Sequence, residues 1–276
     1  MEERKKIIPI IIGVVAILLI AGLVFYFVKI KGNDSKPETD SSLPDNYVED
    51  KFINLDEVLK KDRVLIQTLV RQIPYKNGLY QNIYDGEEVK IDNIKPQLLF
   101  NMSYNNLNEI KEGTEEYNKI KKENSVLYAN YFIKKQDIID NIKKLYNVSL
   151  NDLPSEIDLV GGDAKEYKDY YGFVFASEPG GLIKISKIVS YTISNNSVVI
   201  YEKPAFYEVD MESITLYSDA NGKNKLITLE PSDNIVDTLI KNMKENLSKL
   251  DTYEHIFKKE NNNYYWSSIS TTHEGK

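Results

Sequence analysis

A long apolar segment near the N-terminus constrains this chain more than any other feature. Residues 7–28 form a run of 22 residues without Asp, Glu, Lys or Arg, dominated by Ile, Val, Leu, Ala and Phe. At about 1.5 Å of rise per residue, this run makes a helix of roughly 33 Å, and the hydrocarbon core of a bilayer is about 30 Å thick. A helix on the surface of a soluble protein needs a polar stripe, which this segment lacks. The sequence therefore predicts a transmembrane helix over residues 7–28.

A cleaved signal peptide is the main alternative, because the charged stretch Glu2–Lys6 precedes the apolar run. The apolar part of a signal peptide has only about 7–15 residues and is followed by small residues. This run is longer and ends in the bulky residues Phe25–Val28. The chain has no Cys, which excludes a lipid-modified cysteine anchor. We therefore expect an uncleaved signal anchor, with the lipid bilayer as the partner of residues 7–28.

The flanking charges give little information on the orientation of the segment. The flanking positive charges are nearly balanced, with Arg4, Lys5 and Lys6 before the segment and Lys29, Lys31 and Lys36 after it. The positive-inside rule therefore separates the two orientations only weakly. Because most N-terminal signal anchors leave a short head in the cytoplasm, we expect residues 1–6 to be that head. This predicts a single-pass protein of the cell membrane with an extracytoplasmic C-terminal domain.

The segment after the apolar run changes in composition and charge. Residues 29–50 are rich in Asp, Asn, Ser and Pro without apolar periodicity, which predicts a flexible linker to a folded domain over residues 51–276. Residues 1–31 hold five of the 35 basic and two of the 42 acidic residues, so 30 basic and 40 acidic residues follow them. This negative excess repels phosphate backbones, and we expect no nucleic-acid partner.

Apolar spacing predicts a mainly helical part over residues 51–125. A first helix is expected from a capping pair of Asn54 and Glu57 to Pro74, because apolar residues recur every three or four positions and proline stops the run. Pro96 is expected in the first turn of a second helix, and a third is expected to follow Thr114.

Residues 126–272 are predicted to be rich in strands. The apolar run Val126–Ile133 favours a strand that feeds a helix over Gln136–Tyr146, which Asn147 ends. A loop is expected over residues 147–166. Alternation with a period of two then predicts strands, which we place near residues 171–175, 183–185, 189–193, 252–258 and 264–270.

Turn residues and one further helix complete the expected fold. Hairpin turns are expected at residues 195–196, 219–222 and 261–263, because Asn, Asp and Gly tolerate positive φ. A helix over residues 235–247 is expected to have Ser232 or Asp233 as its cap. Helices followed by an antiparallel meander with a helix docked on one face predict an α+β fold.

The composition excludes several kinds of active site. With no Cys and 2 His, the chain cannot hold a thiol nucleophile, cysteine-ligated zinc, an iron–sulfur cluster or c-type haem. Neither a Gly-x-Ser-x-Gly nor a Ser-x-x-Lys motif is present. We therefore assign no catalytic, cofactor-binding or metal-binding residue and expect no cofactor.

Weaker patterns have simpler interpretations. Asp219–Asn224 alternates oxygen-bearing side chains near Gly222, as a calcium-binding loop does. Such a loop also needs a Glu six positions after the glycine, and this chain has Thr228 there, so a hairpin turn is favoured. Carboxylate pairs for glycoside cleavage exist only as coincidental candidates, namely Glu156 with Asp158, and Asp163 with Glu166 and Asp169.

Tyrosine is over-represented, at 20 residues. Two aromatic clusters are candidates for flat surfaces that bind glycans or peptides, namely Tyr167, Tyr170 and Tyr171, and Tyr264, Tyr265 and Trp266. The alternative is that these residues lie in half-buried strands, which tyrosine also favours.

Two stretches carry a resemblance. The segment Tyr131–Ile138 leading into Ile142–Tyr146, and the ending Ile256–Lys259 with Asn263–Trp266, are similar in style to single-pass membrane-anchored extracytoplasmic proteins of low-GC Gram-positive bacteria. The head, apolar segment, linker and exported domain also resemble that group. The resemblance implies a location and carries no activity to this chain.

These observations favour a membrane-anchored extracytoplasmic binding or assembly module of the cell envelope. Two alternatives stay open. One is an enzyme that acts on cell-wall glycan or peptide through Asp and Glu, for which converging carboxylates of shifted pKa in a cleft would be the signature. The other is an accessory subunit of a membrane complex, recognised through its transmembrane helix.

Overall fold

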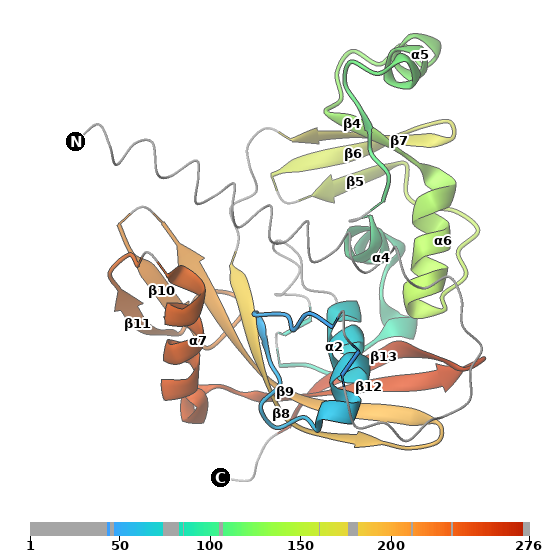
Figure 1. Ribbon diagram of the computed structural model, residues 1–276. Coiled ribbons are helices and arrows are strands. Elements are labelled where there is room, and N and C mark those ends of the chain that lie inside the picture. Colours follow the sequence, from blue (N-terminus) through green and yellow to red (C-terminus); the bar gives the residue numbers. More distant parts are fainter. Residues whose placement is uncertain are drawn as a thin grey trace.

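The computed structural model describes most of the chain after residue 46 (Figure 1). The described residues are 43–44, 47–73, 83–84, 86–104, 107–159, 161–175, 182–210, 212–232 and 234–272. The head 1–6, the transmembrane prediction over 7–28 and most of the linker lie outside them. Within the described residues, no helix is both long enough and apolar enough to cross a bilayer.

The fold is α+β, with two antiparallel-rich sheets and five α-helices in the described part. The larger sheet has the order β1-β8-β9-β12-β13-β2, with β10 and β11 on a side branch. Its strands are β1 (Ile53–Asn54), β2 (Val89–Lys90), β8 (Ile183–Ile193), β9 (Ser197–Val209), β10 (Ile214–Tyr217), β11 (Lys225–Leu229), β12 (Thr252–Glu260) and β13 (Asn263–Thr272). The branch arises because β9 pairs with β12 along its first half and with β10 along its second half.

The two faces of the larger sheet bury different sets of side chains. Because side chains alternate along a strand, Ile200 and Phe206 of β9 lie in the core on one side, while Ala205 and Tyr207 lie in the core on the other. Helix α2 (Arg63–Gln72) contributes to the first core and α7 (Ile235–Glu245) to the second. The helix that we expected to dock on one face is α7, and α2 covers the other face because both faces of the sheet are apolar.

The smaller sheet has the order β3-β4-β7-β6-β5. Its strands are β3 (Ile110–Lys111), β4 (Tyr131–Lys134), β5 (Glu156–Leu159), β6 (Gly162–Tyr167) and β7 (Tyr170–Phe175). Helices α4 (Pro96–Ser103) and α6 (Lys135–Tyr146) join it to the larger sheet, and Figure 1 shows both helices between the two sheets. One core is continuous through this region, since Phe100 contacts Tyr171 while Tyr146 meets Trp266 with ring centroids 6.4 Å apart.

Several helix predictions are confirmed. Helix α4 begins with Pro96, and α5 (Glu115–Glu123) follows Thr114, whose side chain accepts a hydrogen bond from the backbone N–H of Tyr117. Helix α6 ends at Asn147, which adopts the left-handed conformation expected of a C-terminal stop. Ile73 ends α2 in an extended conformation, while Pro74 itself lies outside the described residues.

The start of the first helix was predicted wrongly. Asn54 belongs to β1, which pairs in parallel with β8, and its side chain donates to Asp56 instead of capping a helix. The short 3₁₀ helix η1 (Lys60–Asp62) precedes α2, which begins only at Arg63. With β1, β2, η2 (Ile91–Asn93) and β3, residues 51–125 are less helical than predicted.

Two further boundaries also differ from the sequence predictions. Residues 147–166, expected to be a loop, contain β5 and most of β6, because Ile157 and Ala164 face the core while charged neighbours face solvent. The strand predicted from Val126 begins only at Tyr131. The strands expected near 183–185 and 189–193 are one strand, β8, with an irregularity between Ile188 and Ser190.

The hairpin predictions are confirmed. Residues 194–196 connect β8 to β9, and residues 218–224 connect β10 to β11. Asn261 and Asn262, both at positive φ, connect β12 to β13. The helix predicted over 235–247 is α7, followed by the 3₁₀ helix η3 (Leu247–Lys249). The cap position of α7 is Asn234, so the prediction of Ser232 or Asp233 as the cap was wrong. Ser232 accepts hydrogen bonds from Asn234 and Thr238, and Asp233 lies outside the described residues.

Candidate functional site

The strongest cluster of ionisable side chains lies inside the larger sheet, on the face toward α2. Lys184 and Ser186 come from β8, Glu202 from β9 and His255 from β12. Lys184 and Ser186 are two positions apart and therefore share a face, and the strand order β8-β9-β12 places Glu202 between them and His255. Tyr84, from the segment before β2, covers the group.

The Glu202 carboxylate is the centre of the cluster. Its Oε1 accepts hydrogen bonds from Lys184 Nζ at 2.7 Å and from the Ser186 hydroxyl. Its Oε2 accepts from the Tyr84 hydroxyl and from His255 Nε2, each at 2.8 Å. A carboxylate offers about four acceptor positions, and all four are used here. The side chain is 0% exposed, so these partners replace its hydration entirely.

Tyr84 links the carboxylate to its counter-ion. Its hydroxyl donates to Glu202 and accepts from Lys184 Nζ at 2.8 Å, and the same ammonium lies 5.0 Å from the centre of the Tyr84 ring. The backbone carbonyl of Tyr84 accepts from the Tyr253 hydroxyl at 3.2 Å. The buried charge of Lys184 is thus balanced by Glu202 and by an aromatic face.

In its neutral form, His255 has a hydrogen-bond partner at each ring nitrogen. Nε2 donates to Glu202, and Nδ1 accepts from the indole N–H of Trp266 at 3.4 Å. A second proton would occupy Nδ1 and oppose the Trp266 donor. Because the ring is 0% exposed, water cannot compensate for that lost contact. We therefore assign the tautomer with its proton on Nε2.

Burial and charge act on these pKa values in opposite directions. Burial raises the pKa of Glu202, but the charge of Lys184 and the hydrogen bond from His255 outweigh it and hold that pKa well below its ordinary value. For His255 burial is the largest influence and lowers the pKa, although Glu202 acts to raise it. The cluster is therefore most stable with Glu202 ionised and His255 neutral.

This arrangement is suited to holding strands together rather than to attacking a substrate. Ser186 and His255 contact different oxygens of Glu202, so the hydroxyl donates to a carboxylate and not to an imidazole base. The group connects three neighbouring strands and the segment before β2 through one carboxylate. The sequence contains only a weak indication of this group. Glu202 lies on the same face of β9 as the buried residues Val198, Ile200 and Phe206, so its charged side chain had to be buried as well.

The tyrosine clusters do not form exposed aromatic faces as a whole. Trp266 is 0% exposed and packs beside His255 and Tyr146, so it offers no exposed aromatic face. Tyr171 is also buried, and its hydroxyl donates to the carbonyl of Pro154 at 2.6 Å. The other members of the two clusters are partly buried, namely Tyr167, Tyr170, Tyr264 and Tyr265. The half-buried-strand interpretation fits these residues.

The candidate carboxylates lie in ion pairs or on exposed strand positions. Glu156 is exposed on β5 and pairs with Lys165 at 2.7 Å, which lowers its pKa through the hydrogen bond from Lys165. Glu166 pairs with Lys135 at 2.5 Å, and Lys135 also reaches Asp152. Asp158 and Asp163 face each other across the β5–β6 pair and are exposed. Asp169 is exposed in the turn between β6 and β7.

The residues 219–224 form a turn, as favoured above. Asp219 accepts three backbone N–H hydrogen bonds, from Asn221, Lys223 and Asn224. Its oxygens are therefore used within the turn, and Gly222 has the positive φ that the turn requires. Among the described residues, no group of three or more His, Asp or Glu side chains is placed to hold a metal ion.

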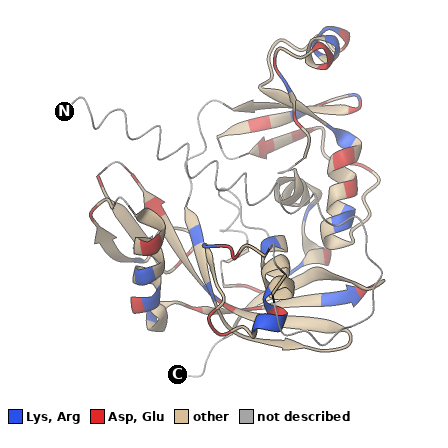
Figure 2. Cartoon of the chain, viewed as in Figure 1, with Lys and Arg blue, Asp and Glu red and all other residues tan. Residues whose placement is uncertain are grey.

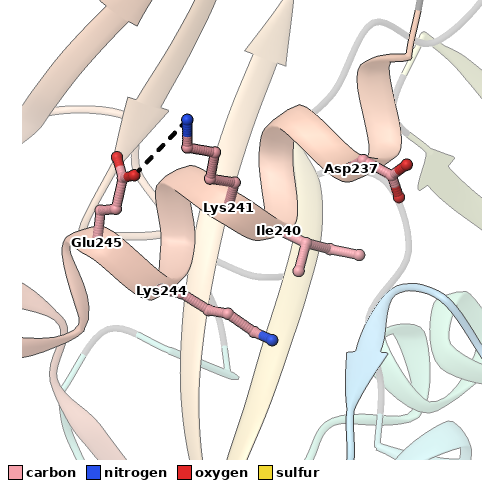
Figure 3. Close-up of a pocket in the computed structure, with 5 residues that line it drawn as sticks. All are labelled: Asp237, Ile240, Lys241, Lys244 and Glu245. Carbon is pink, nitrogen blue, oxygen red and sulfur yellow. Dashed lines mark ion pairs between the residues drawn. The ribbon is translucent and has the colours of Figure 1, made fainter.

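A shallow hollow of about 500 Å³ lies along α7 (Figure 3). Asp237, Ile240, Lys241, Lys244 and Glu245 line it. Lys241 and Glu245 are 3.9 Å apart, and Lys244 pairs with Asp56 at 2.9 Å. Figure 2 shows the alternation of charge along this helix. Because two basic and two acidic groups offset each other, the hollow has no net charge to select a ligand.

In comparisons with known proteins, no family model, no curated protein and no solved structure matches the chain.

Proposed function

We propose that this protein is a membrane-anchored extracytoplasmic module that binds or assembles with other components of the cell envelope. The observation that carries the proposal is the uncharged run over residues 7–28, whose length fits a bilayer. The linker that follows it leads into the folded body at Tyr47, whose hydroxyl donates to Gln67 of α2 at 3.1 Å.

The attachment of the linker supports a tethered arrangement. Glu49 pairs with Arg63 at 2.9 Å and Asp50 with Arg71 at 3.0 Å, so consecutive ion pairs fix this part of the chain to α2. The Asp50 backbone N–H also donates to Gln67 at 2.8 Å. These contacts give the folded body a defined point from which the linker leaves.

The interior of the body supports binding over catalysis. Glu202 contacts both Lys184 and His255, and all three side chains are buried. Such a network stabilises one arrangement of strands, which suits a rigid scaffold. The enzyme alternative would draw on surface carboxylates, and two of the five named candidates, Glu156 and Glu166, are already paired with lysines.

Cysteine labelling tests the anchor and its orientation, because the native chain has no Cys to interfere. In cells that express the full chain, Lys223→Cys in the β10–β11 turn should react with a membrane-impermeant maleimide before lysis. Glu3→Cys in the head should react only after permeabilisation. The reverse pattern would place the body in the cytoplasm, and release of the chain by alkaline carbonate would contradict the anchor.

A segment exchange separates binding by the body from recognition of the helix. Residues 7–28 are replaced by an unrelated transmembrane segment in the full chain, and envelope components are photocrosslinked from exposed positions on the body. We expect the same crosslinked species before and after the exchange. Loss of those species with unchanged membrane insertion would favour the accessory-subunit alternative instead.

A further inference from the structure

Helix α5 and the loop after it form one end of the molecule, beyond the smaller sheet (Figure 1). Tyr117 and Ile120 of α5 pack against Phe132 of β4 in a small core of their own. The tip loop, residues 125–130, connects the helix to β4. The sequence predicted a strand over this apolar stretch, and the structure has a projecting loop instead.

Hydrogen bonds define the shape of the tip loop. The backbone N–H of Val126 donates to the carbonyl of Lys121 at 3.0 Å, and the Tyr117 hydroxyl donates to the carbonyl of Ala129 at 2.5 Å. Asn130 is held by β7, because its backbone N–H donates to Phe173 and its side-chain oxygen accepts from Phe175, each at 2.7 Å. The loop is therefore anchored at both of its ends.

This anchored loop presents two adjacent apolar side chains to solvent. Leu127 is 93% exposed and Tyr128 is 51% exposed, while Val126 and Ala129 on either side of them are buried. The Tyr128 hydroxyl accepts a hydrogen bond from Asn130 at 3.0 Å, which orients its ring. Side chains this exposed contribute little to the core. A fixed loop that projects them into solvent is therefore suited to binding an apolar surface outside the protein.

Positive charge lies next to this apolar pair. The last turn of α5 ends immediately before the tip loop and carries Lys121 and Lys122. The charge of Glu123, the last residue of the helix, is offset by Lys119, whose ammonium lies 4.0 Å from the carboxylate. Figure 2 shows both signs of charge on the helix. A leucine and a tyrosine beside two lysines form the combination that favours the interface between hydrocarbon and lipid headgroups.

We propose that the tip loop contacts the surface of the bilayer in which the chain is anchored. This inference rests on the proposed anchoring through residues 7–28. The linker permits it: roughly 18 residues between the apolar run and Tyr47 can extend to about 60 Å. A folded body of about 230 residues has a radius of gyration of about 17 Å, so the linker is long enough for this end to reach the membrane.

Energy transfer in reconstituted vesicles tests the contact. The full chain with Asn118→Cys, an exposed position on α5, carries a donor dye and is inserted into phosphatidylcholine–phosphatidylglycerol vesicles that contain an acceptor-labelled lipid. Adding Leu127→Ser and Tyr128→Ser should lower the transfer by about twofold or more, because both apolar contacts are removed. Leu59→Ser, a matched change at a leucine that is 60% exposed elsewhere, should leave transfer unchanged.

The outcomes separate the two proposals. Flotation of the chain with vesicles after carbonate treatment reports on the anchor alone. If the chain floats and transfer is the same with and without the tip substitutions, the tip loop does not contact lipid, although the anchor stands. If the chain does not float, the proposed anchoring fails and the lipid contact fails with it. Leu127→Ser alone, which alters no hydrogen bond, checks that an effect does not come from misfolding.

Discussion

The carboxylate of Glu202 and the imidazole of His255 are 2.8 Å apart, and both side chains are 0% exposed. They come from the neighbouring strands β9 and β12. Lys184 lies on β8, the other neighbour of β9, and on the same face of the sheet. Among the described residues, it supplies the only full positive charge in contact with this carboxylate. The stability of the larger sheet therefore depends on a charge balance inside its core as well as on apolar burial.

Glu202→Gln should destabilise the protein strongly. The substitution keeps the shape of the side chain but leaves the Lys184 ammonium buried without its anionic partner, which costs about 3–5 kcal/mol. Urea unfolding of the full chain, followed by the fluorescence of Trp266, the single tryptophan and a neighbour of the cluster, measures this loss. Glu230→Gln, at an exposed position, is the matched control and should change stability by less than about 0.5 kcal/mol. Equal effects of the two variants would contradict the charge balance.

The effects of Lys184 and Glu202 should not be additive. Lys184→Met alone leaves a buried carboxylate without its cation, and Glu202→Gln alone leaves a buried cation without its carboxylate. In the double variant neither charge remains, so its loss of stability should be smaller than the sum of the single losses by about 1 kcal/mol or more. A double-mutant cycle from the same unfolding measurements checks this value. Strict additivity would show that the two groups act independently.

Elements with local signals were predictable from the sequence. The boundaries of α6 agree with the prediction to one residue, because its apolar face and Asn147 specify it locally. The start of α2 was missed because β1 is defined by pairing with β8, whose residues Ser186 and Lys187 are far away in sequence. Strands β5 and β6 were missed because they are short and carry many charged residues, and because the sheet they extend is completed by the pairing of β7 with the distant strand β4.

The buried cluster was less predictable than the fold. A charged residue at an inward position of a strand, such as Glu202, signals a buried partner but does not identify it. Lys184, Glu202 and His255 lie close together only because β8, β9 and β12 are neighbours in the sheet, and this strand order could not be predicted from the sequence. Trp266 was ambiguous in the sequence, because an aromatic residue in a half-apolar strand fits a core as well as a surface, and the structure places it in the core.

Gly162→Ala should be more destabilising than Gly113→Ala. A Cβ atom at position 162 would overlap the Val174 carbonyl oxygen and the Phe175 backbone, which lie on the paired strand β7 and cannot move independently. Such overpacking costs about 1–3 kcal/mol. Gly113 has open space around it and only a positive φ of 87°, so its substitution should cost about 1 kcal/mol. Thermal unfolding of both variants compares the two costs, and a larger loss for Gly113→Ala would contradict the close approach at β7.

Acidification should weaken the fold in two steps. Burial holds the pKa of His255 below its ordinary value of 6.5, so the unfolded chain binds a proton at this residue before the folded chain does. Stability from this residue is complete above about pH 6.5 and decreases as the pH falls toward the folded pKa. The pKa of Glu202 lies below its ordinary value of 4.5, because Lys184 and His255 together outweigh the effect of burial, so a second loss of stability begins below about pH 4.5.

His255→Gln isolates the first of these steps. The amide of glutamine can still donate to Glu202 but does not titrate, so the variant is less stable than the native chain at pH 7.5 and loses less of its stability on going to pH 5. Unfolding midpoints of both proteins across this range, read from Trp266 fluorescence, give the two slopes. Parallel slopes would mean that His255 takes up its proton equally in the folded and unfolded states, which its complete burial against Glu202 and Trp266 argues against.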